Sequence, residues 1–280
     1  MQFKKYQGAG NDFIIINNIR EQIPQEELSR IAAKLCPRRI SVGADGFMAA
    51  EKPQHGGDFR MLFYNADGSE GEMCGNGARC IARFGFEEGL AGEEMAIETV
   101  AGMVRAFKLN EDLYKIRLND VTTMNLECKL QVEIDGESAV WNCAYVELGN
   151  PGIPHLVVKY AGLAETDEKK LWKLGNALRR HNSLPKGANV NFYEINKDGS
   201  IFERTFERGV EDFTYACGTG TGSVAAVLIR EGIVSGDMPV SISMIGGVLQ
   251  IEAIRDNEGS FTDIYLIGPA EKVYTGEISL

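Results

Sequence analysis

Two cysteines each stand directly before a glycine-rich segment that is typical of the start of a helix. The first is Cys74, in "MCGNGARCIARFGFEEGL", and the second is Cys217, in "YACGTGTGSVAAVLIREGI". The unpaired N–H groups and the positive dipole end of a helix N-terminus favour an anion, so they favour a thiolate there. The glycines allow a ligand to approach the backbone, whose N–H groups can hold a carboxylate. Each segment therefore offers an acid/base thiol beside an anion cradle.

Two such segments suggest one reaction. If both thiols approach the same carbon from opposite sides, one thiolate can remove a proton and the other thiol can return one. The two groups must then differ in protonation state, as a general base and a general acid do. Helix N-termini would stabilise the negative charge that develops on the substrate carboxylate. The pattern predicts inversion of a carboxylate-bearing carbon without a cofactor.

The cysteine segments belong to a longer internal repeat. The aligned pairs are Cys74 with Cys217, Gly75 with Gly218, Gly77 with Gly220, and Asn65 with Arg208. With small changes of offset, "VGAD" resembles "KGAN" and "GND" resembles "GNP". After each segment comes an alternating pattern with glycine at a turn, which predicts hairpins turning at Ala101–Gly102 and Gly246–Gly247. Because the matches keep their order, we expect two homologous halves.

The expected halves are an N-terminal lobe, residues 1–120, and a C-terminal lobe, residues 121–262. Residues 263–280 are expected to form a final strand and tail that return to the N-terminal lobe. Helical spacing of apolar residues predicts helices over Gln25–Cys36 and Asp167–His181, the second capped by Thr166 or Asp167. Alternation predicts strands, which are Arg60–Tyr64, Ile201–Phe206, Ser241–Met244 and Phe261–Ile267. The fold class is α+β.

Composition excludes several classes of protein. The chain has 280 residues and a formal net charge of −11, so it lacks the basic surface that nucleic-acid binding needs. No apolar run is long enough to span a membrane, and no signal peptide is expected at the N-terminus. The six cysteines lack disulfide or zinc spacing, and the three histidines lie far apart. We expect a cytoplasmic protein with reduced thiols and no metal.

Other cysteines and motifs give weaker signals. Cys36, Cys80, Cys128 and Cys143 lack the glycine-rich helix entry and are expected to be buried apolar residues. The glycine motifs do not fit a dinucleotide fingerprint or a Walker A loop. A Cys–His hydrolase would leave the second cysteine segment unexplained.

Several motifs together resemble the diaminopimelate epimerase family along nearly the whole chain. They are "GAGNDFIIIN", "NADGSEGEMCGNGARC", "PKGANVNF", "FERGVEDFTYACGTGTGS" and the Gly-Asn-Pro of residues 149–151. The resemblance implies two similar pseudo-symmetric lobes, each a strongly curved, mainly antiparallel sheet around a central helix, with the active site in the cleft. It implies a cofactor-independent, two-base epimerase that interconverts LL- and meso-diaminopimelate for lysine and peptidoglycan synthesis. It also implies a homodimer.

The resemblance assigns roles residue by residue. Cys74 and Cys217 are the expected acid/base pair. The expected substrate-binding residues are Asn11, Asn65, Gly75, Asn76, Asn150, Asn189, Glu207, Arg208, Gly218 and Thr219. Within this set Arg208 can clamp a second carboxylate with two hydrogen bonds. Glu207 could pair with a distal ammonium or support proton transfer; alternatively, it is a surface charge at a strand end.

One stretch departs from the family pattern. The family reads Gly-Asn-Pro-His, whereas here Gly152-Ile153-Pro154 intervene before His155. Either His155 is displaced and has no role, or the loop bulges and returns it as a supporting residue. The insertion keeps a second substrate open, with the same chemistry acting on histidine or another amino acid. A third reading is a two-lobed binding protein with inert thiols.

Overall fold

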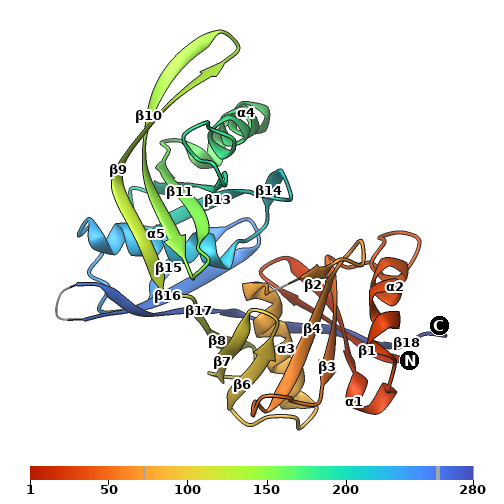
Figure 1. The fold of residues 1–280 in the computed structure, drawn as a ribbon. Coiled ribbons are helices and arrows are strands. Elements are labelled where there is room, and N and C mark those ends of the chain that lie inside the picture. Colours follow the sequence, from red (N-terminus) through yellow and green to blue (C-terminus); the bar gives the residue numbers. More distant parts are fainter. Residues whose placement is uncertain (72, 257–258, 280) are drawn as a thin grey trace. The chain divides into compact units, whose positions relative to one another are not determined.

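The computed structural model describes residues 1–71, 73–256 and 259–279; Glu72, in the first cysteine motif, lies outside them. The chain divides into two compact units (Figure 1). Unit 1 comprises Met1–Arg117 and Ile267–Leu280, and unit 2 comprises Leu118–Leu266. Because the last strands join unit 1, the first and last parts of the sequence fold together.

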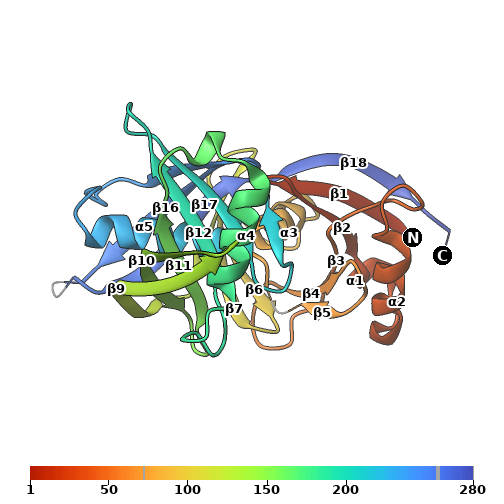
Figure 2. The same cartoon turned by 90° about the horizontal axis from the view of Figure 1, so that it is seen from above.

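Unit 1 is built on one mixed sheet in the order β18-β1-β2-β3-β4-β6-β7-β8, with β5 beside β4. The strands are β1 Gln2–Gly8, β2 Asn11–Asn17, β3 Gly46–Glu51, β4 Phe59–Asn65, β5 Glu70–Gly71, β6 Glu94–Thr99, β7 Gly102–Lys108, β8 Leu113–Leu118 and β18 Glu271–Glu277. Figure 2 shows β18 running beside β1, with which it pairs antiparallel.

Unit 2 is built on a sheet in the order β9-β10-β11-β12-β13-β15-β16, with β14 beside β13. The strands are β9 Val121–Ile134, β10 Glu137–Leu148, β11 Ile153–Lys159, β12 Asn189–Ile195, β13 Ile201–Glu207, β14 Asp212–Thr214, β15 Val240–Met244 and β16 Gly247–Arg255. β17, Phe261–Pro269, carries the chain from unit 2 into unit 1.

The two sheets repeat one topology. In each, the parallel pairs stand at the same two places, β2–β3 and β4–β6 in unit 1, β11–β12 and β13–β15 in unit 2. The remaining pairs named above are antiparallel in both units. The predicted internal repeat and the α+β fold of two similar, mainly antiparallel lobes are therefore confirmed.

One helix lies on each face of each sheet. On one face are the cysteine helices, α3 Gly75–Glu87 against β1, β2, β3 and β7, and α5 Gly218–Arg230 against β10, β11, β12 and β16. On the other face are α2 Gln25–Leu35 and α4 Glu168–Arg179. Short helices complete the set, α1 Asn18–Glu21 and a 3₁₀ turn at Leu163–Glu165. None of the described helices is long and apolar enough to cross a membrane.

The outer helices match their predicted positions. α2 ends at Leu35, one residue before the predicted end, and buries Leu28, Ile31 and Leu35 against the sheet. α4 begins after Asp167, whose side chain accepts a hydrogen bond from the backbone N–H of Lys170 at 3.0 Å. That bond satisfies one of the free N–H groups of the first turn, so Asp167 is the cap.

Both hairpin turns lie one residue earlier than predicted. Thr99 pairs with Gly102, so the turn residues are Val100 and Ala101. In unit 2, Met244 pairs with Gly247, which leaves residues 245–246 in the turn. The second residue of each predicted turn, Gly102 or Gly247, is instead the first residue of the returning strand. Its positive φ, 111° at Gly102 and 132° at Gly247, is a conformation that favours glycine.

The register also corrects one pair of the sequence alignment. At the same place in the two sheets stand the pairs Phe47–Tyr64 and Val190–Phe206. The next residues, Asn65 and Glu207, each end their strand and therefore correspond to one another. The alignment of Asn65 with Arg208 is wrong by one residue, because the loops between cysteine and strand differ in length.

Gly77 and Gly220, in the first turns of α3 and α5, should differ in their tolerance of a side chain. A Cβ on Gly77 would lie 2.2 Å from the terminal methyl group of Met48, which can move aside. A Cβ on Gly220 would lie 2.2 Å from Oδ1 of Asn191, which hydrogen bonds hold in place. We therefore expect Gly220→Ala to destabilise the protein by about 1–3 kcal/mol and Gly77→Ala by less.

Urea denaturation of the two variants and the wild type, followed by circular dichroism, measures this difference. Equal losses at Gly77 and Gly220 would contradict the expectation.

Candidate functional site

Each of the two predicted catalytic cysteines occupies the N-cap of its helix. Cys74 has φ −130° and ψ 123°, and Cys217 has φ −127° and ψ 105°, both extended. The carbonyl oxygen of Cys74 accepts from the N–H of Ala78 at 2.7 Å, and that of Cys217 accepts from Thr221 at 2.9 Å. Each side chain therefore leaves the backbone just outside the first helical turn, whose N–H groups have no partner within the helix.

In unit 1, Asn11 contacts the first thiol. Sγ of Cys74 lies 3.5 Å from Oδ1 of Asn11, and Nδ2 of Asn11 donates to Asp45 at 2.6 Å. Asn11 is the first residue of β2, so the sheet and the helix end bring them together. The amide donates to Asp45, so its oxygen faces the thiol, and the thiol is the donor in that contact.

An ionic network that the sequence reading missed holds Asn11. Asp12 accepts from Lys5 at 2.8 Å and from Arg38 at 3.0 Å, and Arg38 also donates to Asp45 at 2.8 Å. Burial alone would raise the pKa of Asp12, but hydrogen bonds from Arg38 and Lys5 outweigh it and lower the pKa to about 2. Asp12 is therefore ionised at neutral pH and fixes the β2 end.

The other predicted residues of unit 1 lie at the end of β4 and in the first turn of α3. Asn65 donates to the hydroxyl of Ser69 at 3.0 Å. Gly75 and Asn76 form the first turn of α3, where the carbonyl of Gly75 and Oδ1 of Asn76 accept from Arg79 at 3.4 and 2.9 Å. Arg79 is fully buried, and burial lowers its pKa to about 10, which leaves it charged at neutral pH.

Arg79 is a functional candidate that sequence reasoning missed. It lies in the helix that Cys74 caps, and the charges that the Cys80 and Cys74 thiols carry when ionised act against the effect of burial and raise the pKa of its guanidinium. By reciprocity the guanidinium stabilises the thiolate. Its place in the repeat is taken by Gly222 in α5, so unit 2 has no cation there. The difference between Arg79 and Gly222 at one aligned position of the repeat was the sequence signal that could have identified Arg79.

In unit 2 the second thiol has acidic surroundings. Cys217 is 9% exposed, and its Sγ lies 3.7 Å from the hydroxyl of Thr219. Burial and the Glu207 carboxyl raise its pKa well above the ordinary value, while the N–H of Gly220 and the Thr219 hydroxyl act in the opposite direction. Burial also raises the pKa of Glu207. Glu207 is thus a partner of the thiol and is not a free surface charge.

Asn189 and Arg208 are fixed to each other. Oδ1 of Asn189 accepts from the backbone N–H of Arg208 at 2.7 Å, and the Arg208 guanidinium donates to the carbonyl of Lys186 at 3.0 Å. Asn189 is buried at the start of β12 and Arg208 follows the end of β13, so paired strand ends bring them together. The remaining predicted residue of this unit, Gly218, begins α5.

The inserted residues before His155 are absorbed by a turn. In unit 1, Gly8 pairs with Asn11 across a two-residue turn; in unit 2, Leu148 pairs with Ile153 across residues 149–152. Ile153 therefore takes the strand position of Asn11, and Asn150 lies exposed in the turn. The alignment of "GND" with "GNP" is wrong, because the second turn is two residues longer.

His155 is consequently a strand residue and not a loop residue. It is the third residue of β11, the position that Phe13 holds in β2, and it pairs with Asn189. It is fully buried, and burial together with the charge of Arg208 lowers its pKa to about 3. His155 is therefore neutral at physiological pH.

Of the four other cysteines, Cys36, Cys80 and Cys143 are buried as predicted, whereas Cys128 is only half-buried. Burial raises the pKa of Cys36 to about 11 and that of Cys80 and Cys143 to about 12, and it also raises that of Cys128. All six cysteines are free thiols. Among the residues that the structure describes, no group of three or more His, Cys, Asp or Glu side chains is placed to hold a metal ion.

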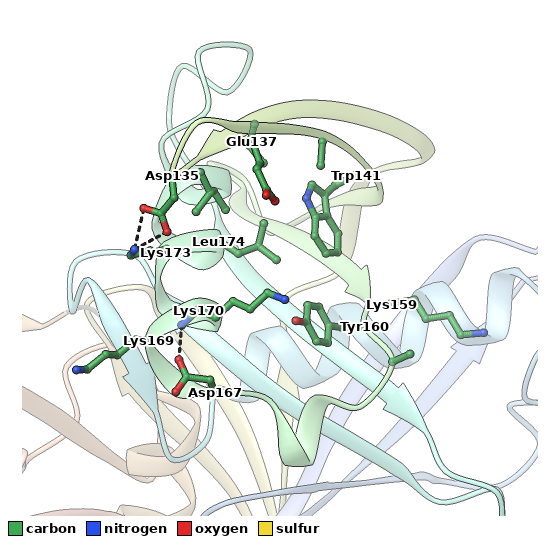
Figure 3. Close-up of a pocket in the computed structure, with 14 residues that line it drawn as sticks. Asp135, Glu137, Trp141, Lys159, Tyr160, Asp167, Lys169, Lys170, Lys173 and Leu174 are labelled. Carbon is green, nitrogen blue, oxygen red and sulfur yellow. Dashed lines mark hydrogen bonds and ion pairs between the residues drawn. The ribbon is translucent and has the colours of Figure 1, made fainter.

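A pocket of about 670 Å³ lies in unit 2 between the β9–β10 hairpin and α4 (Figure 3). Trp141 and Tyr160 stack on one side of it with ring centres 5.8 Å apart, and Lys173 pairs with Asp135 at 2.6 Å. Neither Cys217 nor the residues fixed around it line this pocket. It is therefore separate from the thiol chemistry.

Comparison with known proteins gives the same family from sequence and a wider group from structure. The family model described as diaminopimelate epimerase matches residues 3–119 and 148–273. The chain is 36% identical to a diaminopimelate epimerase of Hydrogenobaculum sp. (strain Y04AAS1), covering all of this chain and 99% of that protein. It is 35% identical to that of Aquifex aeolicus (strain VF5), covering all of this chain and 98% of that protein.

Two solved structures share the fold at low identity. A phenazine biosynthesis protein of the PhzF family from Bacillus anthracis superposes with a TM-score of 0.74 at 16% identity, over all of this chain and 99% of that one. A probable proline racemase from Agrobacterium radiobacter K84 gives 0.70 at 17%, over 100% and 93%. With the full-length sequence matches, these findings establish that the chain belongs to the diaminopimelate epimerase family.

Proposed function

We propose that this protein interconverts LL- and meso-diaminopimelate by proton transfer at the α-carbon, without a cofactor, in the synthesis of lysine and peptidoglycan precursors. The observation that carries the proposal is the pair of cysteines at the N-caps of two helices related by an internal repeat. The full-length relatives named diaminopimelate epimerase support the same substrate. The protein is an isomerase of the epimerase and racemase type.

The mechanism follows from the two helix ends. The backbone N–H groups of Gly75 and Asn76, and of Gly218 and Thr219, hold the carboxylate next to the reacting carbon. One thiolate takes the α-proton, the electron pair moves into the carboxylate as an enediolate, and the other thiol donates its proton to the opposite face. The helix ends stabilise the extra charge on the carboxylate oxygens. The products are the inverted carbon, a new thiol and a new thiolate.

We propose that Cys74 ionises more readily than Cys217 and, once its proton has left the hydrogen bond to Asn11, serves as the base. The buried guanidinium of Arg79 lies in the same helix and favours the thiolate there. Around Cys217, burial and Glu207 favour the neutral thiol. Opposite surroundings thus give the two thiols the different protonation states that general base and general acid need.

The remaining residues recognise the rest of the substrate. The guanidinium of Arg208 can bind a second carboxylate through two hydrogen bonds. Asn11, Asn65 and Asn189 offer amide groups to the substrate, as does Asn150, and His155 supports the site. Glu207 stands next to the second thiol. We also propose that the protein is cytoplasmic, because six free thiols fit a reducing compartment. We propose in addition that it is a homodimer, as the family resemblance implies.

Removal of either thiol should abolish epimerisation. In heavy water, the wild type should incorporate deuterium at the α-carbon of LL-diaminopimelate, whereas Cys74→Ala and Cys217→Ala should lose at least about 10³-fold of the epimerisation rate, since each face then lacks its acid or base. Cys128→Ala is the matched control and should retain activity. Mass spectrometry and chiral chromatography measure both outcomes. Full epimerisation in either alanine variant would refute the two-thiol mechanism.

A panel of amino acids in the same assay tests the substrate. Rapid exchange with histidine or proline, beside none with diaminopimelate, would show a racemase of another amino acid. The absence of exchange with every amino acid, combined with tight binding of one of them, would show a binding protein.

Arg208→Lys should separate binding from chemistry. Lysine keeps the charge but loses the paired donors, so KM for diaminopimelate should rise by about 10-fold or more with a smaller change in kcat. The steady-state rates over a range of substrate concentrations measure this. An unchanged KM would mean that Arg208 does not contact the distal carboxylate.

The two thiols should also differ in reactivity. Iodoacetamide at pH 7 should label Cys74 faster than Cys217, because the thiolate is the nucleophile and Cys217 is buried as a thiol. Tryptic mass spectrometry at short times reads the order. Arg79→Met should slow the labelling of Cys74. Faster labelling of Cys217 in the wild type would reverse the assignment.

A further inference from the structure

A cluster of five polar side chains is buried beneath the first turn of α5. They come from three neighbouring strands and from α5 itself, and each is at most 3% exposed: His155, Asn191, Glu203, Thr205 and Thr221. A Cβ added at Gly220 would touch both Asn191 and Thr205, which places them against the turn that follows Cys217. Burying polar groups costs free energy unless each finds a partner, so the cluster needs a reason.

The internal repeat shows that the fold itself does not need these groups. The residues at the same register positions of unit 1 are Phe13, Met48, Met61, Phe63 and Ala78. Met48 and Phe13 pack under the first turn of α3, where a Cβ on Gly77 would meet both of them. One copy of the architecture therefore closes with apolar side chains alone, and the polar set is a property of the second copy.

Hydrogen bonds around Asn191 fix the tautomer of His155. Nδ2 of Asn191 lies 3.0 Å from the carbonyl oxygen of Leu156 and 3.1 Å from Nδ1 of His155. A carbonyl oxygen only accepts, so the amide NH₂ must face it, and its second hydrogen points to Nδ1. Nδ1 is then an acceptor, and the ring proton is on Nε2. That Nε2 is buried and has no hydrogen-bond partner among the described residues.

The same reasoning sets the proton of Glu203. The single hydroxyl hydrogen of Thr205 has two neighbours, Oδ1 of Asn191 at 3.0 Å and Oε1 of Glu203 at 3.2 Å. Oδ1 can only accept at any pH, whereas a protonated carboxyl can supply its own hydrogen, so both acceptors are satisfied only if the hydroxyl donates to Oδ1. The hydroxyl of Thr221, also within reach of Glu203, donates to the carbonyl of Cys217 at 2.9 Å. Only lone pairs remain for Glu203, which must bring its own proton.

We propose that Glu203, Thr205 and Asn191 form a chain of positioning residues that begins at a neutral carboxylic acid and holds His155 in its Nε2–H form. His155 thereby presents a buried donor, and not a base, beside the helix that Cys217 caps. We propose that the purpose of this hydrogen-bonded chain is to supply the Nε2–H donor to an acceptor atom of the bound substrate. Only this purpose, and not the hydrogen bonding itself, rests on the proposed function. Burial, which raises the pKa of Glu203 to about 8, agrees with the geometry.

The charged and titratable groups that face this chain are few. Cys217 and Tyr193 face Glu203 from α5 and β12, and Arg208 acts on His155. Burial raises the pKa of Tyr193 to about 12 and that of Cys217 well above the ordinary value. Neither therefore ionises between pH 5 and 8. Burial also raises the pKa of Glu207, which acts on Cys217 as well, so only the difference between the wild type and a Glu203 variant reports on Glu203.

NMR of the full chain labelled with ¹⁵N-histidine tests the tautomer directly, because there are three histidines. His55→Gln and His181→Gln assign the signals by elimination. We expect His155 to stay neutral from pH 5 to 8, with Nε2 protonated and Nδ1 bare. A protonated Nδ1, or an imidazolium in this range, would overturn the proposal. The measurement does not depend on enzymatic activity.

Asn191→Asp is the sharpest variant, since it replaces the donor that faces Nδ1 with an acceptor. We expect the ring proton to move to Nδ1 or the ring to become charged near neutral pH, and kcat to fall more than 10-fold. Asn196→Asp, where the amide donates to Ser200 in an exposed turn, is the matched control. An unchanged His155 signal in the folded Asn191→Asp variant would refute the chain.

Glu203 is tested through the pH dependence of stability. In the fold its pKa is about 8, whereas the ordinary pKa of a glutamate is 4.5, so the carboxyl ionises at lower pH in the unfolded chain. The wild type should therefore lose stability as pH rises from about 4.5 to 8. Glu203→Gln keeps a donor and cannot ionise, so its unfolding constant relative to the wild type should fall on the order of a hundredfold between pH 5 and 8.

Urea denaturation at pH 5 and pH 8 measures this, with exposed Glu165→Gln as the control. Glu203→Met, which carries the residue found at this place in unit 1, should give the same pH dependence as the glutamine variant, even if its stability differs. If the free energy of unfolding changes with pH in the same way in the wild type and in Glu203→Gln, Glu203 is ionised in the fold. That result would overturn the proposal of a neutral carboxylic acid. Loss of activity in every variant without a change in these profiles would count against the chain and leave the thiol mechanism intact.

Discussion

A helix that begins at a cysteine and is buried against a sheet is the constraint on which both units depend. Burial of α3 and α5 fixes where their N-terminal N–H groups point, and those groups make the thiol position an anion site. The first turn of each helix packs so closely on the sheet that it has no room for a Cβ. At Gly77 and at Gly220, an atom of a neighbouring side chain lies 2.2 Å from the place that a Cβ would occupy. The glycines thus serve packing and ligand approach together.

The same architecture is filled with different chemistry in its two copies. Unit 1 has a buried cation, Arg79, in the cysteine helix and apolar residues below it. Unit 2 has Gly222 at the helix position of Arg79, the acidic Glu207 beside the thiol, and a polar cluster below. Under the proposed mechanism, two thiols in similar backbone settings thereby have opposite preferences for charge. An epimerase needs this difference, since one side must accept a proton while the other donates one.

Much of this fold was readable from spacing, whereas register was not. Apolar periodicity predicted α2 and α4, because their buried stripes are local. The alignments of Asn65 with Arg208 and of Asn11 with Asn150 failed, because both cross loops whose lengths differ between the copies. A side chain's face in a sheet changes with every residue, so a shift of one or two positions alters the partner that a strand residue meets.

The sequence by itself determined the internal repeat, the two cysteine helix entries and the type of reaction, because helix starts and glycine positions are set by neighbouring residues. Only the tertiary structure decided that His155 lies in a strand, that Arg79 is buried one turn from Cys74, and that Glu203, Thr205 and Asn191 share hydrogen bonds. These residues are distant in sequence or ordinary in type. Their properties come from burial and from the direction of each hydrogen bond, and both exist only after strands far apart in the chain have paired.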